Sequence, residues 1–187
     1  MEIALFSEVY TQLSGLSTHV KNLASILSEK GHDVTLFTGS GNSKKFRVVN
    51  LPRLPFPFAG GYEMIIPKRL RIKADIVHDH TPYMIGWMAL KQDCPIASTT
   101  PTTPKNLFSE FNLNFLDPLG WKILVKFYNS SDRVICQTES TKELFEEHGL
   151  RKPVSVISSG IDFDFFSGGS SERFKKEYKL PKKFGLS

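Results

Sequence analysis

Residues 3–37, IALFSEVYTQLSGLSTHVKNLASILSEKGHDVTLF, decide the fold of this chain. The stretch begins with a continuous apolar run over residues 3–6, which is typical of a strand buried on both faces of a parallel sheet. Val20, Leu23, Ala24 and Leu27 then recur at i, i+3, i+4 and i+7, the spacing of one helix face. Because a second apolar run follows at residues 34–37, the stretch predicts a parallel strand–helix–strand unit.

The helix of this unit has a predicted start and a predicted end. Ser17 is the candidate N-cap, because a serine hydroxyl can accept a hydrogen bond from a free N–H group of the first turn. Gly31 lies where the helix must stop, since glycine tolerates the left-handed conformation that closes many helices.

The alternation of strands and helices continues along the chain. We expect further strands at residues 46–51, 75–78, 96–99, 133–136 and 154–157, and short helices at 83–90, 140–148 and 172–179. A capping box formed by Ser140 and Glu143 is predicted to start the second of these helices. The three prolines of residues 51–58 predict an extended loop without a regular element. Residues 64–73 are predicted as a helix interrupted by Pro67, and residues 107–128 as two helical pieces broken near Pro118.

This order of elements predicts an α/β fold, a Rossmann-like, doubly wound and mostly parallel sheet. We expect residues 1–166 to form this domain. The run 167–170, Ser-Gly-Gly-Ser, is typical of a hinge, and a basic helix follows it. Residues 167–187 are therefore expected to lead toward a second domain that this sequence does not contain.

Composition limits the class of protein. The chain has 187 residues, 40% hydrophobic and 23% charged, which suits one globular domain. We find neither a secretory signal nor an apolar run approaching the roughly 20 residues that span a bilayer. The only two cysteines, Cys94 and Cys136, form no metal or redox pair, so we expect a cytoplasmic protein, with the inner membrane surface as a further location. A net charge of +5 suits an anionic ligand or plain solubility.

Polar residues follow several of the predicted strands. In an open parallel sheet, ligands bind beyond the carboxyl ends of the strands. The segments expected there consist mostly of small or polar residues; they are residues 7–15, 79–81, 100–103, 137–139 and 158–160. These segments predict a polar crevice along one edge of the sheet.

Gly15 is the most informative residue of the first loop. A residue without a side chain at the start of a helix lets an anion such as a diphosphate approach the free N–H groups. The alternative is a glycine needed only for a tight turn. By contrast, Gly39-Ser40-Gly41 follows the second strand and has Lys44 in place of a third glycine, which argues against a dinucleotide-dependent oxidoreductase.

His78 and His80 project from one side of an extended segment. A metal ion would need a third ligand, and none of His19, His32 and His148 has a recognisable spacing to supply one. We therefore expect no metal. Structural hydrogen bonding and a crevice contact by His80 both remain open.

Several blocks of the sequence, in the correct order, resemble family 4 glycosyltransferases. The blocks are residues 3–8, 14–20 and 31–35, the D-h-V-H-x-H pattern within 75–82, residues 131–135 with 138–140, and residues 156–162. The resemblance implies the GT-B architecture, in which two Rossmann-like domains face each other across a cleft. It also implies retaining transfer of a sugar from a nucleotide diphosphate donor to a hydroxyl acceptor, lipid or glycan, without a metal or other cofactor.

The resemblance also implies roles for residues of this half. Ser14, Gly15 and Leu16 would lie near the donor diphosphate, and the acceptor side would comprise His80, Thr81, Thr99, Thr100 and Glu139. Pro101 stands where the family commonly has a histidine beside the transferring sugar, and His80 or Thr100 are the candidates to replace its catalytic contact. Ser14 replaces the first of two glycines, as in relatives that glycosylate lipids. Because the family's second domain binds most of the donor and supplies two glutamates, we expect the isolated chain to be inactive.

Other functions and partners are also compatible with the sequence. The chain could be a non-catalytic module that binds a sugar or nucleotide, or one subunit of a split transferase whose second domain is supplied in trans. Aromatic and basic residues together suit a membrane surface, whereas packing in the core or between domains is the alternative. These residues are Phe56, Phe58, Tyr62, Phe108, Phe111, Phe115 and Trp121, with Lys68, Arg69, Arg71 and Lys73. No recognisable motif supports nucleic-acid binding.

Overall fold

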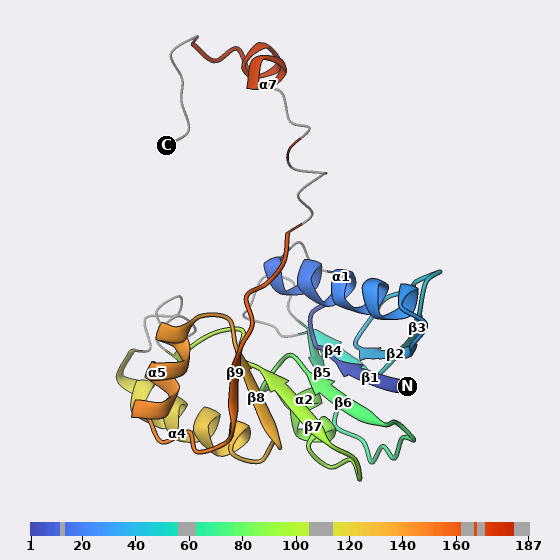
Figure 1. The fold of residues 1–187 in the computed structure, drawn as a ribbon, viewed down its shortest axis with the longest axis vertical. Helices are drawn as coiled ribbons and strands as arrows, with labels where there is room; N and C mark the ends of the chain where they lie inside the picture. Colours follow the sequence, from blue (N-terminus) through green and yellow to red (C-terminus); the bar gives the residue numbers. More distant parts are fainter. Residues whose placement is uncertain (12–13, 56–62, 105–113, 162–166, 168–170, 182–187) are drawn as a thin grey trace.

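The computed structural model describes residues 1–11, 14–55, 63–104, 114–161, 167 and 171–181. Seven strands form one sheet in the order β3-β2-β1-β6-β7-β8-β9, and every neighbouring pair in it is parallel (Figure 1). The strands are β1 (Glu2–Phe6), β2 (Asp33–Thr38), β3 (Arg47–Asn50), β6 (Ile76–Asp79), β7 (Ile96–Thr99), β8 (Arg133–Cys136) and β9 (Val154–Val156). The predicted doubly wound parallel sheet is confirmed.

Helices pack on both faces of this sheet. They are α1 (Gly15–Glu29), α2 (Met84–Ala89), α4 (Asp117–Tyr128) and α5 (Glu139–Glu147). Two short helices are also present, η1 (Asn114–Leu116) and α7 (Ser171–Glu177), and α7 lies apart from the sheet (Figure 1). Successive side chains of β1 point to opposite faces, so Ile3 and Leu5 pack with α1 while Ala4 and Phe6 pack in the cluster that contains α2. This alternation determines which side chains meet at the carboxyl edge.

Helix α1 begins three residues earlier than its predicted cap implied. Ser14, not Ser17, is the N-cap: its hydroxyl accepts a hydrogen bond from the Ser17 N–H at 3.1 Å. The Ser17 hydroxyl in turn accepts from the Ser14 N–H at 3.4 Å, which completes a capping box. Gly31 has a φ of +84° just beyond the helix, so the predicted stop is confirmed.

The segment between β3 and β6 contradicts two predictions. Arg53–Pro55 and Glu63–Ile65 form the antiparallel strands β4 and β5, where a loop without regular structure and the start of a helix were predicted. Residues 66–74 form no helix. Leu70 and Ile72 instead pack on the core at a spacing of two, and the Gln92 side chain bonds their backbone, accepting from the Ile72 N–H and donating to the Leu70 carbonyl, both at 3.1 Å.

Two helix starts also differ from prediction. Pro118 lies in the first turn of α4, where it needs no N–H partner, so it begins the helix and does not break one. Of the predicted first piece, which begins at residue 107 and ends near Pro118, residues 107–113 lie outside the described residues and Asn114–Leu116 form η1. Most of the predicted hinge at 167–170 is also outside the described residues. Helix α5 starts at Glu139 because Thr138, not Ser140, is the N-cap and accepts from the Thr141 N–H at 3.1 Å.

Gly86 allows α2 to approach the loop that follows β6. A Cβ atom at this position would collide with the backbone oxygen of Thr81 and lie 2.7 Å from Cζ of Phe127. No larger residue fits without a shift of the loop or the ring. The glycine therefore fixes the loop that carries His80 and Thr81.

Candidate functional site

The loops after β1, β6 and β7 meet at the carboxyl edge of the sheet. β1 and β6 are in register with Leu5 opposite His78 and Phe6 opposite Asp79. The ladder continues one residue further, because the His80 N–H donates to the Phe6 carbonyl at 2.9 Å. His78 and His80 thus lie on the α1 face of the sheet, and Asp79 lies on the opposite face.

Three histidines gather on the α1 face. The ring centroids of His78 and His80 are 4.1 Å apart, and His19 of α1 lies 5.5 Å from His80. Nε2 of His78 and the Thr99 hydroxyl are 2.7 Å apart, a short hydrogen bond. Sequence spacing gave no sign that His19 belongs here, because only the packing of α1 on β6 brings it to the other two. It lies one turn beyond Gly15, so the cluster adjoins the start of α1.

Burial keeps these imidazoles neutral. Burial, with His19 close by, lowers the pKa of His78 to about 4. Burial, with His78 and His19 adding, lowers the pKa of His80 well below its usual value, and burial also lowers the pKa of His19. His80 is fully buried, yet neither of its ring nitrogens has a hydrogen-bond partner within the described part of the chain. Among those same residues, no group of three or more His, Cys, Asp or Glu is arranged to hold a metal ion.

Two carboxyl groups lie on the opposite face. Oδ1 of the fully buried Asp79 accepts from the Thr81 N–H at 3.3 Å, and Oε1 of Glu8 accepts from the Ile65 N–H of β5 at 2.9 Å. Burial raises the pKa of Glu8 to about 7. Burial, reinforced by the charge of Glu8, raises the pKa of Asp79 well above its usual value, although backbone N–H groups of Thr81 and His80 oppose the shift. No sequence pattern had indicated a role for either carboxyl.

The predicted donor loop lies at the start of α1. Ser14 caps the helix, and Gly15 and Leu16 form its first turn. Gly15 does not have a positive φ, and a Cβ atom added to it would meet nothing within 4 Å. Among the described residues, neither a left-handed backbone conformation nor a close contact therefore requires glycine at this position.

The predicted acceptor residues are not all together. Thr81 accepts from the Glu8 N–H at 3.2 Å, and Thr99 bonds His78, so both join the edge around β6. Thr100 is buried, and its N–H donates a hydrogen bond to the Ile135 carbonyl at 2.9 Å. Glu139 is exposed on α5 and pairs with Lys142 at 3.4 Å, with no described interaction that links it to the histidines.

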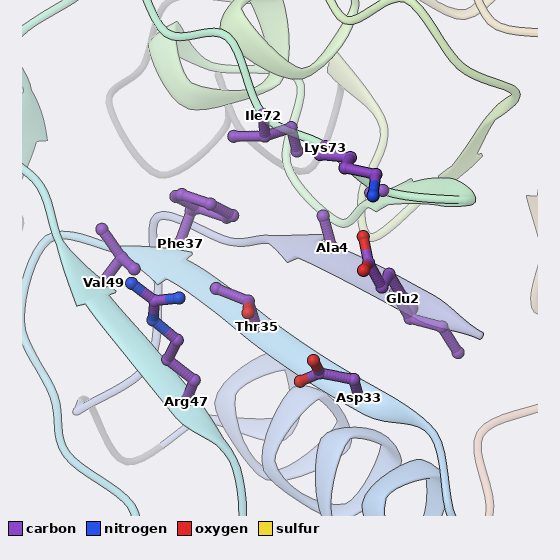
Figure 2. A pocket seen from close by; sticks show the side chains of 11 residues that line it. Glu2, Ala4, Asp33, Thr35, Phe37, Arg47, Val49, Ile72 and Lys73 are labelled. Atoms are coloured by element: carbon purple, nitrogen blue, oxygen red, sulfur yellow. The ribbon is translucent and has the colours of Figure 1, made fainter.

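A separate cavity of about 460 Å³ lies on the sheet face beneath residues 72–74. Figure 2 shows Thr35, Phe37 and Val49 on its floor, and Ile72 and Lys73 on the side opposite. Glu2, Asp33 and Arg47, which begin β1, β2 and β3, also line it. The cavity therefore opens toward the amino ends of these strands, away from the histidines and Gly15.

The parallel sheet, its winding and the polar groups at its carboxyl edge define a Rossmann-like α/β domain of the kind found in GT-B glycosyltransferases. The chain belongs to Glycosyltransferase Family 4, whose family model matches residues 13–165. It is 27% identical over 184 residues to an alpha-monoglucosyldiacylglycerol synthase from Streptococcus pneumoniae (strain ATCC BAA-255 / R6), a match that covers 89% of this chain and 42% of that protein. The chain thus spans less than half the length of this curated relative.

Solved structures of glycosyltransferases share the fold. Sucrose-phosphate synthase from Thermosynechococcus elongatus superposes with a TM-score of 0.70 at 15% identity, over 97% of this chain and 53% of that one. HepE from Anabaena, in complex with UDP-glucose, gives a TM-score of 0.64 at 11% identity, over 96% of this chain and 49% of that one. No helix in the described ranges has the length and apolar character needed to cross a membrane.

Proposed function

We propose that this chain is the acceptor-side half of a retaining glycosyltransferase that moves a sugar from a nucleotide diphosphate donor to a lipid hydroxyl. The observation that carries the proposal is the open start of α1 at Gly15, in a chain of Glycosyltransferase Family 4. The relative from Streptococcus pneumoniae, whose name specifies a glucosylated diacylglycerol, supports a lipid acceptor. The UDP-glucose complex of HepE supports a nucleotide-sugar donor.

In this proposal one side of the site binds the donor diphosphate and the other side binds the acceptor. Ser14, Gly15 and Leu16 lie at the helix N-terminus, where free N–H groups and the helix dipole stabilise the negative charge of the leaving diphosphate. His80, Thr81, Thr99 and Thr100 line the acceptor side, with Glu139 at its outer margin. The neutral form of His80 and its two unpartnered nitrogens suit hydrogen bonding to a sugar or acceptor hydroxyl, a role that Pro101 has no side-chain group to perform. A second domain, in cis or in trans, completes the donor site.

Replacing Gly15 tests the donor side. In the two-domain protein, Gly15→Leu is expected to lower kcat/KM for the nucleotide sugar about 100-fold, because a misplacement of about 1 Å at a reacting centre costs on that order. Folding stability should not fall, since a Cβ atom at this position meets no described atom within 4 Å. The measurement is steady-state transfer kinetics together with urea denaturation.

Asn22→Leu is the matched control, because it adds similar bulk to an exposed position of the same helix. It should leave both the kinetics and the stability near those of the unsubstituted protein. Unchanged donor kinetics in Gly15→Leu would show that the donor diphosphate does not bind next to this loop.

We further propose that α4 lies against an anionic membrane surface. Leu119 and Ile123 of α4 are 53% and 48% exposed, and Phe115 of the preceding η1 is 76% exposed. Lys122 and Lys126 of α4 are exposed as well. Trp121, in contrast, stacks on His148 with ring centroids 3.8 Å apart and packs on the core. The basic residues of the predicted surface are exposed on the segment after β5; they are Lys68, Arg69, Arg71 and Lys73. The other aromatic residues of the predicted surface, Phe56, Phe58, Tyr62, Phe108 and Phe111, lie outside the described residues.

Sedimentation with liposomes tests this surface. Vesicles that contain phosphatidylglycerol should bind the chain at low salt, and Lys122→Gln with Lys126→Gln should weaken binding roughly 10- to 30-fold, since each basic residue near an anionic surface contributes about 1 kcal/mol. Phosphatidylcholine vesicles serve as the control. If the unsubstituted chain does not sediment at low ionic strength, the membrane proposal is wrong.

A further inference from the structure

Glu8 has a carboxyl group to which the proposed function gives no role. The residue lies two positions beyond the end of β1, at the centre of the carboxyl edge. Its backbone N–H donates to the hydroxyl of Thr81, and its Oε1 accepts from the Ile65 N–H. Glu8 is thus held between the loop after β6 and strand β5, next to a residue of the proposed acceptor side.

The second oxygen of this carboxyl group is unsatisfied. Oε2 of Glu8 is buried and has no hydrogen-bond partner within the described structure, and the same holds for Oδ2 of the neighbouring Asp79. Buried polar atoms in folded proteins nearly always have a partner, because leaving one unpaired costs roughly 1–3 kcal/mol. A ligand that carries a hydroxyl group can supply the missing donor.

Of the two carboxyls, Glu8 is the one placed to meet a ligand. Asp79 is fully buried, whereas Glu8 as a residue is only half-buried, although its Oε2 is covered in the domain taken alone. Asp79 on β6 interacts electrostatically with Glu8, and the buried hydroxyl of Tyr128 on α4 interacts in the same way with Asp79. From the described groups of β5, the Ile65 N–H donates to Glu8. With a pKa of about 7, Glu8 is present in both its neutral and its ionised form near neutral pH.

We propose that Glu8 contacts the acceptor, its free carboxyl oxygen accepting a hydrogen bond from the hydroxyl group that receives the sugar. This inference rests on the proposed function and adds an acceptor-orienting residue to it. The contact gives a partner to an oxygen that has none among the described residues, and it orients the attacking oxygen beside Thr81 and His80. A hydrogen bond between a hydroxyl and a carboxylate is worth about 1.5–3 kcal/mol, enough to affect acceptor specificity.

The test uses the two-domain protein with UDP-glucose as the donor and dioctanoylglycerol in mixed micelles as the acceptor. Glu8→Gln should lower kcat/KM for the acceptor roughly 10- to 100-fold, the fold-change that corresponds to about 1.5–3 kcal/mol. The KM for the donor should not change. With Glu8 present, acceptor kcat/KM is expected to rise through pH 7, and in Glu8→Gln this rise should disappear, a result that a purely structural role would not produce.

Two further variants keep the result interpretable. Glu8→Asp, which retains the charge but shortens the side chain, should keep the ionisation and recover part of the activity. Glu2→Gln, at the other end of the same strand, should behave as the unsubstituted protein does. If Glu8→Gln glycosylates the lipid with unchanged acceptor kinetics and pH profile, the role of Glu8 is wrong and the proposed function stands. If the unsubstituted protein transfers no sugar to the lipid, both are wrong.

Discussion

Residues 1–187 alone are expected to transfer sugar at least about 1000-fold more slowly than the two-domain protein, because the proposed function assigns most of the donor site to a second domain, and even one lost group that stabilises the transition state costs about 100- to 1000-fold. The relative from Streptococcus pneumoniae is more than twice as long as the part this chain matches, with 42% of its length covered. The measurement is transfer of labelled glucose from UDP-glucose to dioctanoylglycerol, with circular dichroism to show that the isolated chain is folded.

Adding the second domain as a separate chain distinguishes a split transferase from a non-catalytic binding module. Activity restored by mixing the two would show that the halves can act in trans, as in a split transferase. Rapid transfer by residues 1–187 alone would contradict the expectation and place the complete donor site in this half. Binding of a sugar nucleotide without transfer in any combination would favour the non-catalytic module.

The stability of the domain should respond to pH through opposing groups, and single substitutions should reveal them. The pKa of His78 falls from 6.5 to about 4 on folding, so its contribution is fully present above pH 6.5 and is lost as the pH falls toward 4. The pKa of Glu8 rises from 4.5 to about 7, so its contribution is present below pH 4.5 and is lost as the pH rises through 7. Each shift corresponds to about 3 kcal/mol, and in the unsubstituted chain the two partly cancel.

His78→Gln removes the acid-sensitive group and keeps a polar partner for Thr99. Between pH 7 and pH 4, its free energy of unfolding should gain about 3 kcal/mol relative to that of the unsubstituted chain, and Glu8→Gln should lose about as much. Urea denaturation at several pH values gives both quantities. His32→Gln, a histidine outside the cluster, is the control. Parallel stability curves for all four proteins would contradict the burial of these groups.

The positions of the strands along the chain could be predicted from the sequence because strands buried on both faces need continuous apolar runs, as at residues 3–6 and 34–37. The helix predicted over 64–73 failed because its packing depends on Gln92, a residue distant in the sequence that holds this backbone extended. The cap at Ser14 was missed because both Ser14 and Ser17 have the right chemistry, and only their reciprocal hydrogen bonds show which one precedes the helix.

The site was harder to predict than the fold. Gly15, His80 and Thr81 could be placed at the carboxyl edge, since that edge follows from strand order alone. Glu8 lies within residues 7–15, which were also expected at this edge, but its contact with Ile65 could not be predicted, and neither could the place of His19. His19 reaches His80 only through the packing of α1 on the sheet, and Glu8 reaches Ile65 only through the unpredicted strand β5. Contacts of this kind depend on register and packing, which local sequence patterns do not specify.

Analysis of the glycolipid made by the two-domain protein tests the central claim most directly. UDP-glucose, in which the sugar is α-linked, and dioctanoylglycerol are supplied, and the anomeric configuration of the product is determined by NMR spectroscopy. Our account predicts an α-linked glucosyl lipid. A β-linked product would contradict retention, and the absence of any glycosylated lipid would contradict the proposed reaction itself.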